Sequence, residues 1–207
     1  MKILHIDSSP LADASVSRLL TKSIVTALTA AHPGQEVTYL DLAETPPPHL
    51  TGELMQVVKF RNLDALNPSQ REELARTDAL VDQFLAADIV VIGAPMYNFS
   101  LPTQLKAWID RVSQAGRTFR YTETGPVGLA GGRKVIIASA RGGLYAGMPY
   151  EAALDHQEAY LRAVLGFWGV TDIAVIRAEG VAMGPEARAK ALAAAEREIA
   201  TLVATLG

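Results

Sequence analysis

Cysteine is absent from the 207 residues of this sequence. Its absence excludes disulfide bonds, thiolate zinc sites, iron–sulfur clusters and cysteine nucleophiles. A large surplus of either charge is absent too, because 19 Lys and Arg residues nearly balance 22 Asp and Glu residues, for a net charge of −3. Binding to nucleic acid or to an anionic membrane surface favours strongly basic proteins, so neither partner is expected.

The sequence also lacks long hydrophobic runs. Its apolar start is interrupted at Asp7, whereas a secretory signal needs ~7–15 apolar residues and a membrane helix about 20. The 4 histidines are scattered, with no pair at the spacing of metal ligands, so no metal site is expected. The nucleotide-binding fingerprints G-x-G-x-x-G and G-x-x-x-x-G-K-[ST] are missing as well. These absences favour a cytoplasmic protein without a membrane partner.

What the sequence does contain is a regular alternation of apolar runs and amphipathic segments. Continuous β-branched runs, of which residues 89–92 are the clearest, are typical of strands buried on both faces of a parallel sheet. Strands are predicted at residues 2–7, 36–42, 88–94, 134–140 and 170–178, and helices at 15–31, 69–87, 102–115, 150–167 and 185–206. The pattern predicts one α/β domain over residues 1–207, a three-layer doubly wound sheet of five parallel strands with helices on both faces.

Two connections are longer than this minimal pattern needs. Residues 44–67 contain a run of three prolines and then an extra helix around residues 52–63, and residues 116–132 form an excursion rich in Gly, Thr and aromatic residues. Long insertions in compact domains are often functional. On the second strand, Val37, Tyr39 and Leu42 are predicted to face the packed side.

Serines dominate the loop that follows the first predicted strand. Ser9, Ser15 and Ser17 offer hydroxyl groups, and Ser15 is a good N-cap for the helix that follows. The free N–H groups and positive dipole end of that helix add to them, so the loop can hold a phosphate monoester without a lysine. The alternative is that these serines only cap the helix and form turns.

Aromatic residues and one side-chain amide follow the third strand, in Met96-Tyr97-Asn98-Phe99. In the strand order 2-1-3-4-5, strands one and three are neighbours and the ligand crevice lies between their carboxyl ends. This loop and the serine loop therefore face one ligand, and apolar surface beside an amide suits the edge of a flat polar ring. The alternative is that the aromatic residues fill the core.

A further loop, from Ser139 to Tyr145, leaves the same edge of the predicted sheet and contains Arg141-Gly142-Gly143. Glycines allow the backbone to approach a ligand closely, and their N–H groups can donate to it. Alone, this tripeptide is compatible with any turn. Beside the other two loops, it completes a pocket.

With these motifs, the chain resembles the FMN-dependent NADH-azoreductases, also described as NADH:quinone oxidoreductases, of the flavodoxin-like superfamily. The most specific motif runs from Pro95 to Pro102 and leads into Leu105-Lys106-Ala107-Trp108-Ile109-Asp110-Arg111. Further agreement comes from Ser9, Ser15-Val16-Ser17, Arg141-Gly142-Gly143, Gly166-Phe167-Trp168-Gly169-Val170 and Ala178-Glu179-Gly180. The resemblance covers nearly the whole chain and implies a flavodoxin-like fold with strand order 2-1-3-4-5.

The resemblance also implies a homodimer with one FMN per subunit. It implies phosphate binding by Ser9, Ser15, Val16 and Ser17, and contact with the isoalloxazine ring by Met96, Tyr97, Asn98, Phe99, Ser139, Ala140, Arg141, Gly142 and Gly143. The implied substrate site comprises Phe99, Phe119, Tyr121, Tyr145 and Phe167, with some of these aromatic residues contributed by the partner subunit. Tyr145 departs from the pattern, because some relatives have a histidine after this glycine turn.

The implied activity is hydride transfer from NADH or NADPH through N5 of FMN to a quinone or an azo compound. A quinone takes two electrons, whereas cleavage of an azo bond to amines takes four and thus two cycles. One binding place used in turn by donor and acceptor predicts ping-pong kinetics. No catalytic side chain is expected, because the hydride chemistry belongs to the flavin. The alternative is a flavodoxin-type electron carrier without a substrate site, but the mild net charge and the two insertions favour the enzyme.

Overall fold

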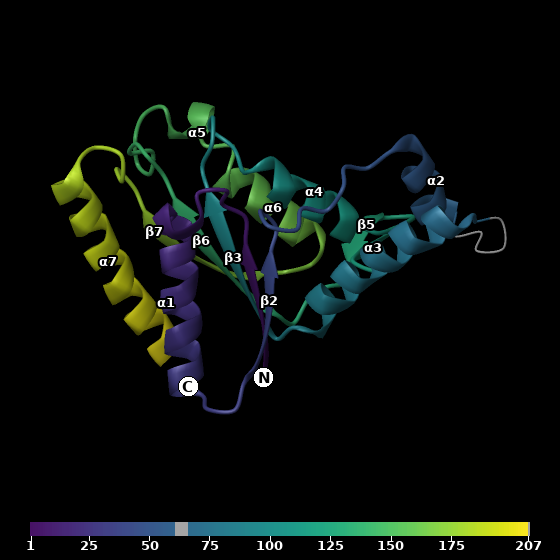
Figure 1. Cartoon of the computed structure of the whole chain (residues 1–207), viewed down its shortest axis with the longest axis horizontal. Helices are drawn as coiled ribbons and strands as arrows, with labels where there is room; N and C mark the ends of the chain where they lie inside the picture. The colour runs from purple at the N-terminus through teal and green to yellow at the C-terminus, as the bar shows by residue number, and fades with distance from the viewer. Residues whose placement is uncertain (61–65, 207) are drawn as a thin grey trace.

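The computed structural model describes residues 1–60 and 66–206. Its centre is a sheet of five strands, β1 (Lys2–Asp7), β2 (Glu36–Asp41), β3 (Ile89–Pro95), β6 (Lys134–Ala140) and β7 (Asp172–Ala178). Their order is β2-β1-β3-β6-β7, and each neighbouring pair is parallel (Figure 1). Because β4 and β5 belong to a separate hairpin, this is the predicted order 2-1-3-4-5. The predicted doubly wound, flavodoxin-like fold is confirmed.

Helices cover both faces of this sheet, as Figure 1 shows. On one face lie α1 (Val16–Ala31) and α7 (Pro185–Ala204), and on the other lie α3 (Pro68–Ala86), α4 (Thr103–Val112) and α6 (Glu158–Phe167). Alternate residues of β3 face opposite sides of the sheet. Val91 packs with α1 and α7, while Val90 and Ile92 pack with the other three helices. Among the described residues, no helix combines the length and apolar character needed to cross a membrane.

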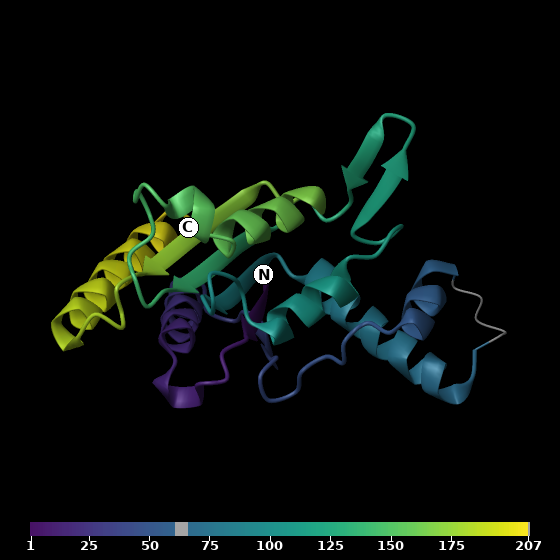
Figure 2. The same ribbon diagram turned by 90° about the horizontal axis from the view of Figure 1, so that it is seen from above.

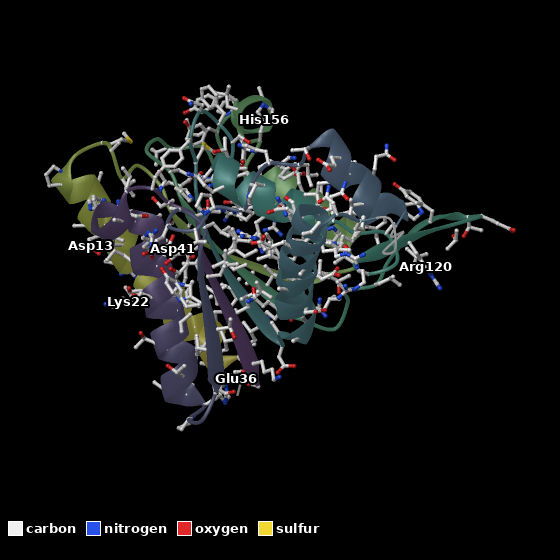
Figure 3. The ribbon with its side chains drawn as sticks, turned by 45° about the vertical axis from the view of Figure 1, so that its right-hand side comes forward. Asp13, Lys22, Glu36, Asp41, Arg120 and His156 are labelled. Carbon is white, nitrogen blue, oxygen red and sulfur yellow. The ribbon has the colours of Figure 1, made fainter. Side chains whose placement is uncertain are left out.

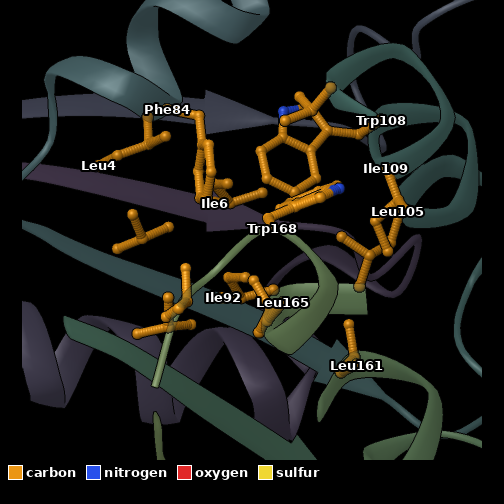
Figure 4. Packing of buried hydrophobic residues seen from close by; sticks show 14 of the residues in the cluster. Leu4, Ile6, Phe84, Ile92, Leu105, Trp108, Ile109, Leu161, Leu165 and Trp168 are labelled. Carbon is orange, nitrogen blue, oxygen red and sulfur yellow. The ribbon is translucent and has the colours of Figure 1, made fainter. Parts of the chain in front are cut away.

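Three large aromatic side chains form the centre of the layer that contains α3, α4 and α6 (Figure 4). The ring centroid of Phe84 lies 5.8 Å from that of Trp108 and 5.1 Å from that of Trp168, and the two indole rings are 6.1 Å apart. All three pairs meet edge to face, the arrangement that the aromatic quadrupole favours. This packing holds α3, α4 and the end of α6 together as one layer.

The two long insertions form additional elements. The first includes α2 (Gly52–Phe60), and positions 61–63 of the helix predicted there lie outside the described residues. The second forms an antiparallel hairpin of β4 (Phe119–Thr122) and β5 (Gly125–Gly128), which projects away from the sheet (Figure 2). At its base, glycine is required at position 128, because an added Cβ would lie 2.1 Å from the N atom of Gly169.

Two local predictions are wrong. The helix predicted over residues 150–167 is interrupted and forms α5 (Glu151–Leu154) and α6, because the carboxylate of Asp155 accepts hydrogen bonds from the N–H groups of Gln157 and Glu158. Val37 and Tyr39 are 39% and 52% exposed instead of packed, because β2 lies at the edge of the sheet.

Candidate functional site

Three loops meet at the carboxyl edge of the sheet: the serine loop (residues 8–17), the aromatic loop (residues 96–100) and the glycine loop (residues 139–146). The hydroxyl oxygens of Ser9 and Tyr97 are 3.1 Å apart and join the first two loops. The N–H of Met96 donates to the carbonyl oxygen of Ala140 at 2.8 Å and joins the second to the third. This edge contains the switch point between β1 and β3, where ligands bind in doubly wound sheets.

The serine loop buries its hydroxyl groups. Ser9 and Ser17 are 0% exposed, and Ser15 is 2% exposed. Ser15 caps α1, because its Oγ accepts a hydrogen bond from the N–H of Arg18, and the same Oγ lies 3.1 Å from Ser17 Oγ. Val16 is the first residue of α1, so the loop ends at the positive end of the helix dipole. Buried hydroxyl groups at a helix N-terminus suit an anion such as a phosphate.

The aromatic loop is a tight turn with an uncommon backbone conformation. Tyr97 and Ser100 exchange two N–H···O hydrogen bonds of 2.9 and 3.0 Å. Between them, Asn98 and Phe99 have φ angles of 48° and 69°. Asparagine tolerates this left-handed conformation, but it costs a residue such as Phe99 ~1–2 kcal/mol. Such strain is typical of ligand sites, where the surrounding structure maintains it. The turn leaves the Phe99 side chain 43% exposed at the edge of the sheet.

Two N–H groups of the glycine loop are available to a ligand. The carbonyl oxygens of Gly142 and Gly143 accept hydrogen bonds from Ala182 and Gly180, at 3.1 and 2.9 Å. Among the described residues, no acceptor takes the N–H group of either glycine. The carbonyl oxygens of this turn therefore already accept hydrogen bonds within the protein, whereas its two N–H groups are free to donate to a ligand.

The side chain of Arg141 lies beneath this loop and does not reach its outer surface. It is 0% exposed and donates to Ser139 Oγ and to Gln157 Oε1, both at 3.1 Å. It also forms ion pairs with three carboxylates: Asp155 at 2.7 Å, Glu158 at 2.6 Å and Glu179 at 3.0 Å. The backbone of Arg141 is occupied too, because its N–H donates to Ala178 at 2.9 Å and its carbonyl oxygen accepts from Val181 at 3.2 Å. The predicted cofactor contact of Arg141 stays a prediction. Ser139 is directed inward too, because its Oγ donates to Gln157 at 3.0 Å.

The five predicted substrate-site residues form two separate groups in one chain. Phe99 and Tyr145 meet edge to face at the sheet edge, with ring centroids 6.4 Å apart. Phe119 packs against Tyr121 and Phe167 at the hairpin, with centroid distances of 5.5 and 4.5 Å. Because His156 beside Phe99 precedes α6 and Phe167 ends it, the groups are separated by the ~15 Å length of a ten-residue helix. In Figure 3, His156 and Arg120 of the hairpin lie in different parts of the molecule.

Charged side chains lie beside the serine loop on the side of β2. Arg18 and Asp41 form an ion pair there, and Asp41 lies beside α1 (Figure 3). Burial alone would raise the pKa of Asp41, but hydrogen bonds from the Arg18 guanidinium and from the N–H groups of Ala43 and Glu44 lower it overall. The hydrogen bond to Asp41 raises the pKa of Arg18. Burial, and then the charge of Asp7, raise the pKa of Tyr39. At neutral pH this cluster is therefore an ion pair beside a neutral phenol.

Sequence reasoning missed Arg18, Asp41 and Gln157, which support the loops, and it predicted Arg141 as a cofactor contact instead of a support. Arg18 and Asp41 are separated by 23 positions, and Arg141 is separated from Gln157 and Glu179 by 16 and 38 positions. Contacts this distant leave no local pattern, and each residue taken alone reads as a surface charge or amide. Among the described residues, no three His, Asp or Glu side chains are grouped so as to hold a metal ion.

Comparisons with known proteins identify the family of this chain. The sequence profile of the flavodoxin-like fold matches residues 1–203. The FMN-dependent NADH:quinone oxidoreductase of Azospirillum brasilense is 74% identical over 202 residues, which cover 98% of this chain and 97% of that protein. A crystal structure of an azoreductase from Bacillus anthracis str. Sterne has a TM-score of 0.90 at 30% identity and covers 98% of both chains.

A second structure from Bacillus anthracis str. Ames Ancestor, an FMN-dependent NADH-azoreductase in complex with FMN, also has a TM-score of 0.90, at 27% identity. The match covers 99% of this chain and 98% of that one. The fold, the convergence of the three loops and these similarities lead to one assignment: the chain belongs to the flavodoxin-like family and, within it, to the FMN-dependent NADH:quinone oxidoreductases.

Proposed function

We propose that this chain, as a single domain over residues 1–207, is an FMN-dependent oxidoreductase that uses NADH or NADPH to reduce quinones and to cleave aromatic azo compounds to amines. One observation carries the proposal: buried serine hydroxyls, available glycine N–H groups and an exposed aromatic turn converge at one sheet edge. The phosphate, the polar ring edge and the ring face of FMN require these three kinds of surface. The names of the similar proteins support the same cofactor and activity.

The serine loop fits the phosphate of FMN. A phosphate monoester carries a charge of about −1.5 to −2 at neutral pH, and the first turn of α1 offers N–H groups and a positive dipole end to it. The hydroxyl groups of Ser9, Ser15 and Ser17 add donors that can rotate toward the phosphate oxygens. Val16 contributes through its backbone, because it opens the helix.

The other two loops fit the isoalloxazine ring. The N–H groups of Gly142 and Gly143 can donate to the carbonyl oxygens of the ring edge. The turn at Asn98 and Phe99 offers an amide and an aromatic face. Met96 and Ala140 hold these two loops together through their shared backbone hydrogen bond, so we propose that they shape the pocket by their backbone.

When bound, FMN supplies a ring that accepts hydride at N5 and passes it on. The chain supplies binding and orientation. Phe99 is fixed at the open side by the strained turn and by the hydrogen bond from the N–H of His156 to its carbonyl oxygen, at 3.0 Å. A rigid aromatic wall at this position aligns a flat donor or acceptor with the bound cofactor and lowers the entropy cost of reaction.

We expect NAD(P)H and the electron acceptor to bind one after the other at the same site, because the three loops meet at a single edge of the sheet. Initial rates measured at varied NADH and varied benzoquinone test this expectation. Parallel double-reciprocal lines, with each substrate competing against the other, are the predicted outcome. Intersecting lines from a ternary complex would contradict it. The same assay with an azo dye compares the two acceptor classes.

The homodimer is part of the proposal, because the two aromatic groups lie apart in one chain. Tyr121 is 72% exposed on the projecting hairpin, and Val127 and Leu129 are each 39% exposed. A second copy would cover these side chains and bring its Phe119, Tyr121 and Phe167 toward the open side of Phe99. Light scattering of the purified protein tests this, with twice the chain mass of 22.1 kDa expected.

The cofactor and reaction class are tested by one spectrum. The purified chain is reconstituted with FMN, desalted, and mixed with NADH in the absence of oxygen. A retained yellow colour that bleaches and then returns on addition of a quinone supports the proposal. A colourless protein would overturn the assignment of FMN. A yellow protein that ignores both NADH and NADPH would favour the electron carrier instead. The cytoplasmic location stays a prediction, which fractionation of producing cells tests.

A further inference from the structure

Arg18 lies in the first turn of α1, and its guanidinium group binds only groups of the protein. Nε donates to the Ser9 carbonyl oxygen at 3.2 Å, and Nη2 donates to the same oxygen at 3.0 Å and to Asp41 Oδ1 at 2.8 Å. Nη1 donates to Asp41 Oδ2 at 2.5 Å and to the Tyr39 hydroxyl at 3.1 Å. A guanidinium has five N–H donors, and these five contacts occupy all of them. Arg18 therefore has no donor left for a ligand.

The target of Arg18 is the backbone of the proposed phosphate site. Ser9 is fully buried, and its hydroxyl group faces Tyr97 across the site. Its carbonyl oxygen takes two hydrogen bonds from Arg18, which match the two lone pairs of a carbonyl. The next residue is Pro10, which has no N–H. A rotation of the Ser9–Pro10 peptide would therefore offer the site only an oxygen, which repels an anion.

Asp41 fixes the direction of the Arg18 side chain. Its two oxygens bind Nη1 and Nη2 in the bidentate geometry that carboxylates form with arginine. One of those oxygens also accepts hydrogen bonds from the N–H groups of Ala43 and Glu44, at 2.9 and 3.2 Å. The Arg18 and Asp41 side chains are only 18% and 13% exposed. The pair therefore links the end of β2 to the backbone of the serine loop.

We infer that Arg18, held by Asp41, is a positioning residue that makes the serine loop selective for a phosphorylated flavin. It keeps the Ser9 carbonyl oxygen turned away from the phosphate and the Ser9 hydroxyl turned toward it, without touching the ligand. This inference rests on the proposed function, because it requires that the serine loop binds the phosphate of FMN. Riboflavin lacks that phosphate and shares the ring system, so it separates the loop from the rest of the site.

The measurement is the affinity of the flavin-free protein for FMN and for riboflavin, followed by quenching of flavin fluorescence. In Arg18→Met, we expect the Kd for FMN to rise ~10-fold or more, as for the loss of a charge-assisted hydrogen bond. The Kd for riboflavin is expected to change less than about 2-fold. Equal changes for the two flavins, or no change for either, would overturn the inference.

Arg18→Lys distinguishes positioning from attraction by charge. Lysine keeps the positive charge but lacks the planar fork that reaches Ser9 and Asp41 together. Positioning predicts that Arg18→Lys loses most of the preference for FMN over riboflavin, as Arg18→Met does. A lysine variant with the wild-type preference would show that charge alone matters and would overturn the inference. This variant also decides the question if Arg18→Met does not fold.

Two controls complete the experiment. Arg76→Met removes an arginine whose side chain is 55% exposed and pairs within its own helix, so both flavins should bind as in the wild type. The wild-type protein tests the proposed function by itself. If it does not bind FMN, the proposed function fails. If it binds FMN more tightly than riboflavin, and the Arg18 variants keep that preference, only the inference fails.

Discussion

The serine loop and the glycine loop are both held from behind by an arginine, but the two arginines differ in their surroundings. Arg18 is 18% exposed and pairs with Asp41 at the edge strand β2, with Asp7 as a more distant partner at 3.8 Å. Arg141 is 0% exposed and contacts Asp155, Glu158 and Glu179 in the interior. Water can replace some contacts of the first arginine and none of the second. The difference indicates that Arg18 mainly affects ligand binding, whereas Arg141 mainly affects folding.

The largest expected effect is that of Arg141→Met on stability. The substitution leaves the buried carboxylate of Asp155, at 8% side-chain exposure, without its ion-pair partner, and leaves Glu158, at 6%, with Arg177 alone. Removing one member of a buried ionic cluster costs ~3–5 kcal/mol in the free energy of unfolding. Urea unfolding measures this loss, and Arg18→Met serves as the matched control with an expected loss of ~1–2 kcal/mol. A larger loss for Arg18→Met than for Arg141→Met would contradict the comparison.

Glu179→Gln is expected to have the next largest effect, and it acts on the glycine loop alone. Glu179 Oε1 accepts hydrogen bonds from Arg141 at 3.0 Å and from the N–H groups of Tyr145 and Ala146, both at 3.1 Å. The neutral amide weakens these bonds, and the expected loss of stability is ~1–2 kcal/mol. Because Tyr145 meets Phe99, we also expect a higher KM for the quinone. The ratio of riboflavin to FMN affinities should stay unchanged, and a changed ratio would show that the two loops are coupled.

Because of the ion pair between Arg18 and Asp41, the free energy of unfolding should depend on pH in the acidic range. The folded-state pKa of Asp41 lies below its unfolded value, so its contribution is present above the unfolded pKa of ~3.9. It is lost as pH falls through the folded pKa. We therefore expect the difference in unfolding free energy between wild type and Asp41→Asn to be constant above pH ~5 and to shrink below pH ~4.

Urea unfolding at a series of pH values measures that difference. Asp172→Asn is the control, because the Asp172 side chain is 59% exposed in its pair with Lys134 and should give a much smaller difference. A difference between wild type and Asp41→Asn that grows as the pH is lowered would contradict the assignment of Asp41 as the ionised partner.

The smallest expected effect is that of Tyr39→Phe. The Tyr39 hydroxyl accepts from Arg18 at 3.1 Å and donates to Asp7 at 3.1 Å, but the residue is 52% exposed. Water can replace the hydroxyl, so a loss of ~0.5–1 kcal/mol in unfolding free energy is expected. The preference for FMN over riboflavin should change less than about 2-fold. A change as large as that of Arg18→Met would show that Tyr39, and not the Ser9 carbonyl contact, sets the preference.

The sequence was sufficient to predict the sheet and the loops that meet at its edge. Apolar runs such as residues 89–92 are long because both faces of β3 are buried, whereas the strand order was implied by the resemblance to the flavodoxin-like proteins. Val37 and Tyr39 were assigned to the wrong environment, because nothing in the local pattern distinguishes an edge strand from a central one. The interruption of the helix at Asp155 depends on side-chain hydrogen bonds, which apolar spacing does not reveal.

The site itself was predictable only in part. Serines and glycines after strands indicate ligand loops, but the roles of Arg18 and Arg141 depend on partners far away in the sequence. The left-handed turn had one local signal, since asparagine tolerates that conformation, whereas Phe99 adopts it without any. Residues that act through others are therefore the part of this site that requires a structure.

A crystal structure of this chain grown with FMN tests the central claim most directly. The account predicts that the phosphate lies among the hydroxyl groups of Ser9, Ser15 and Ser17, with the ring edge at the N–H groups of Gly142 and Gly143. It also predicts that Arg18 keeps its hydrogen bonds to the Ser9 carbonyl oxygen and does not touch the phosphate. A phosphate bound elsewhere would contradict the proposed site, and an Arg18 side chain turned onto the phosphate would contradict its positioning role.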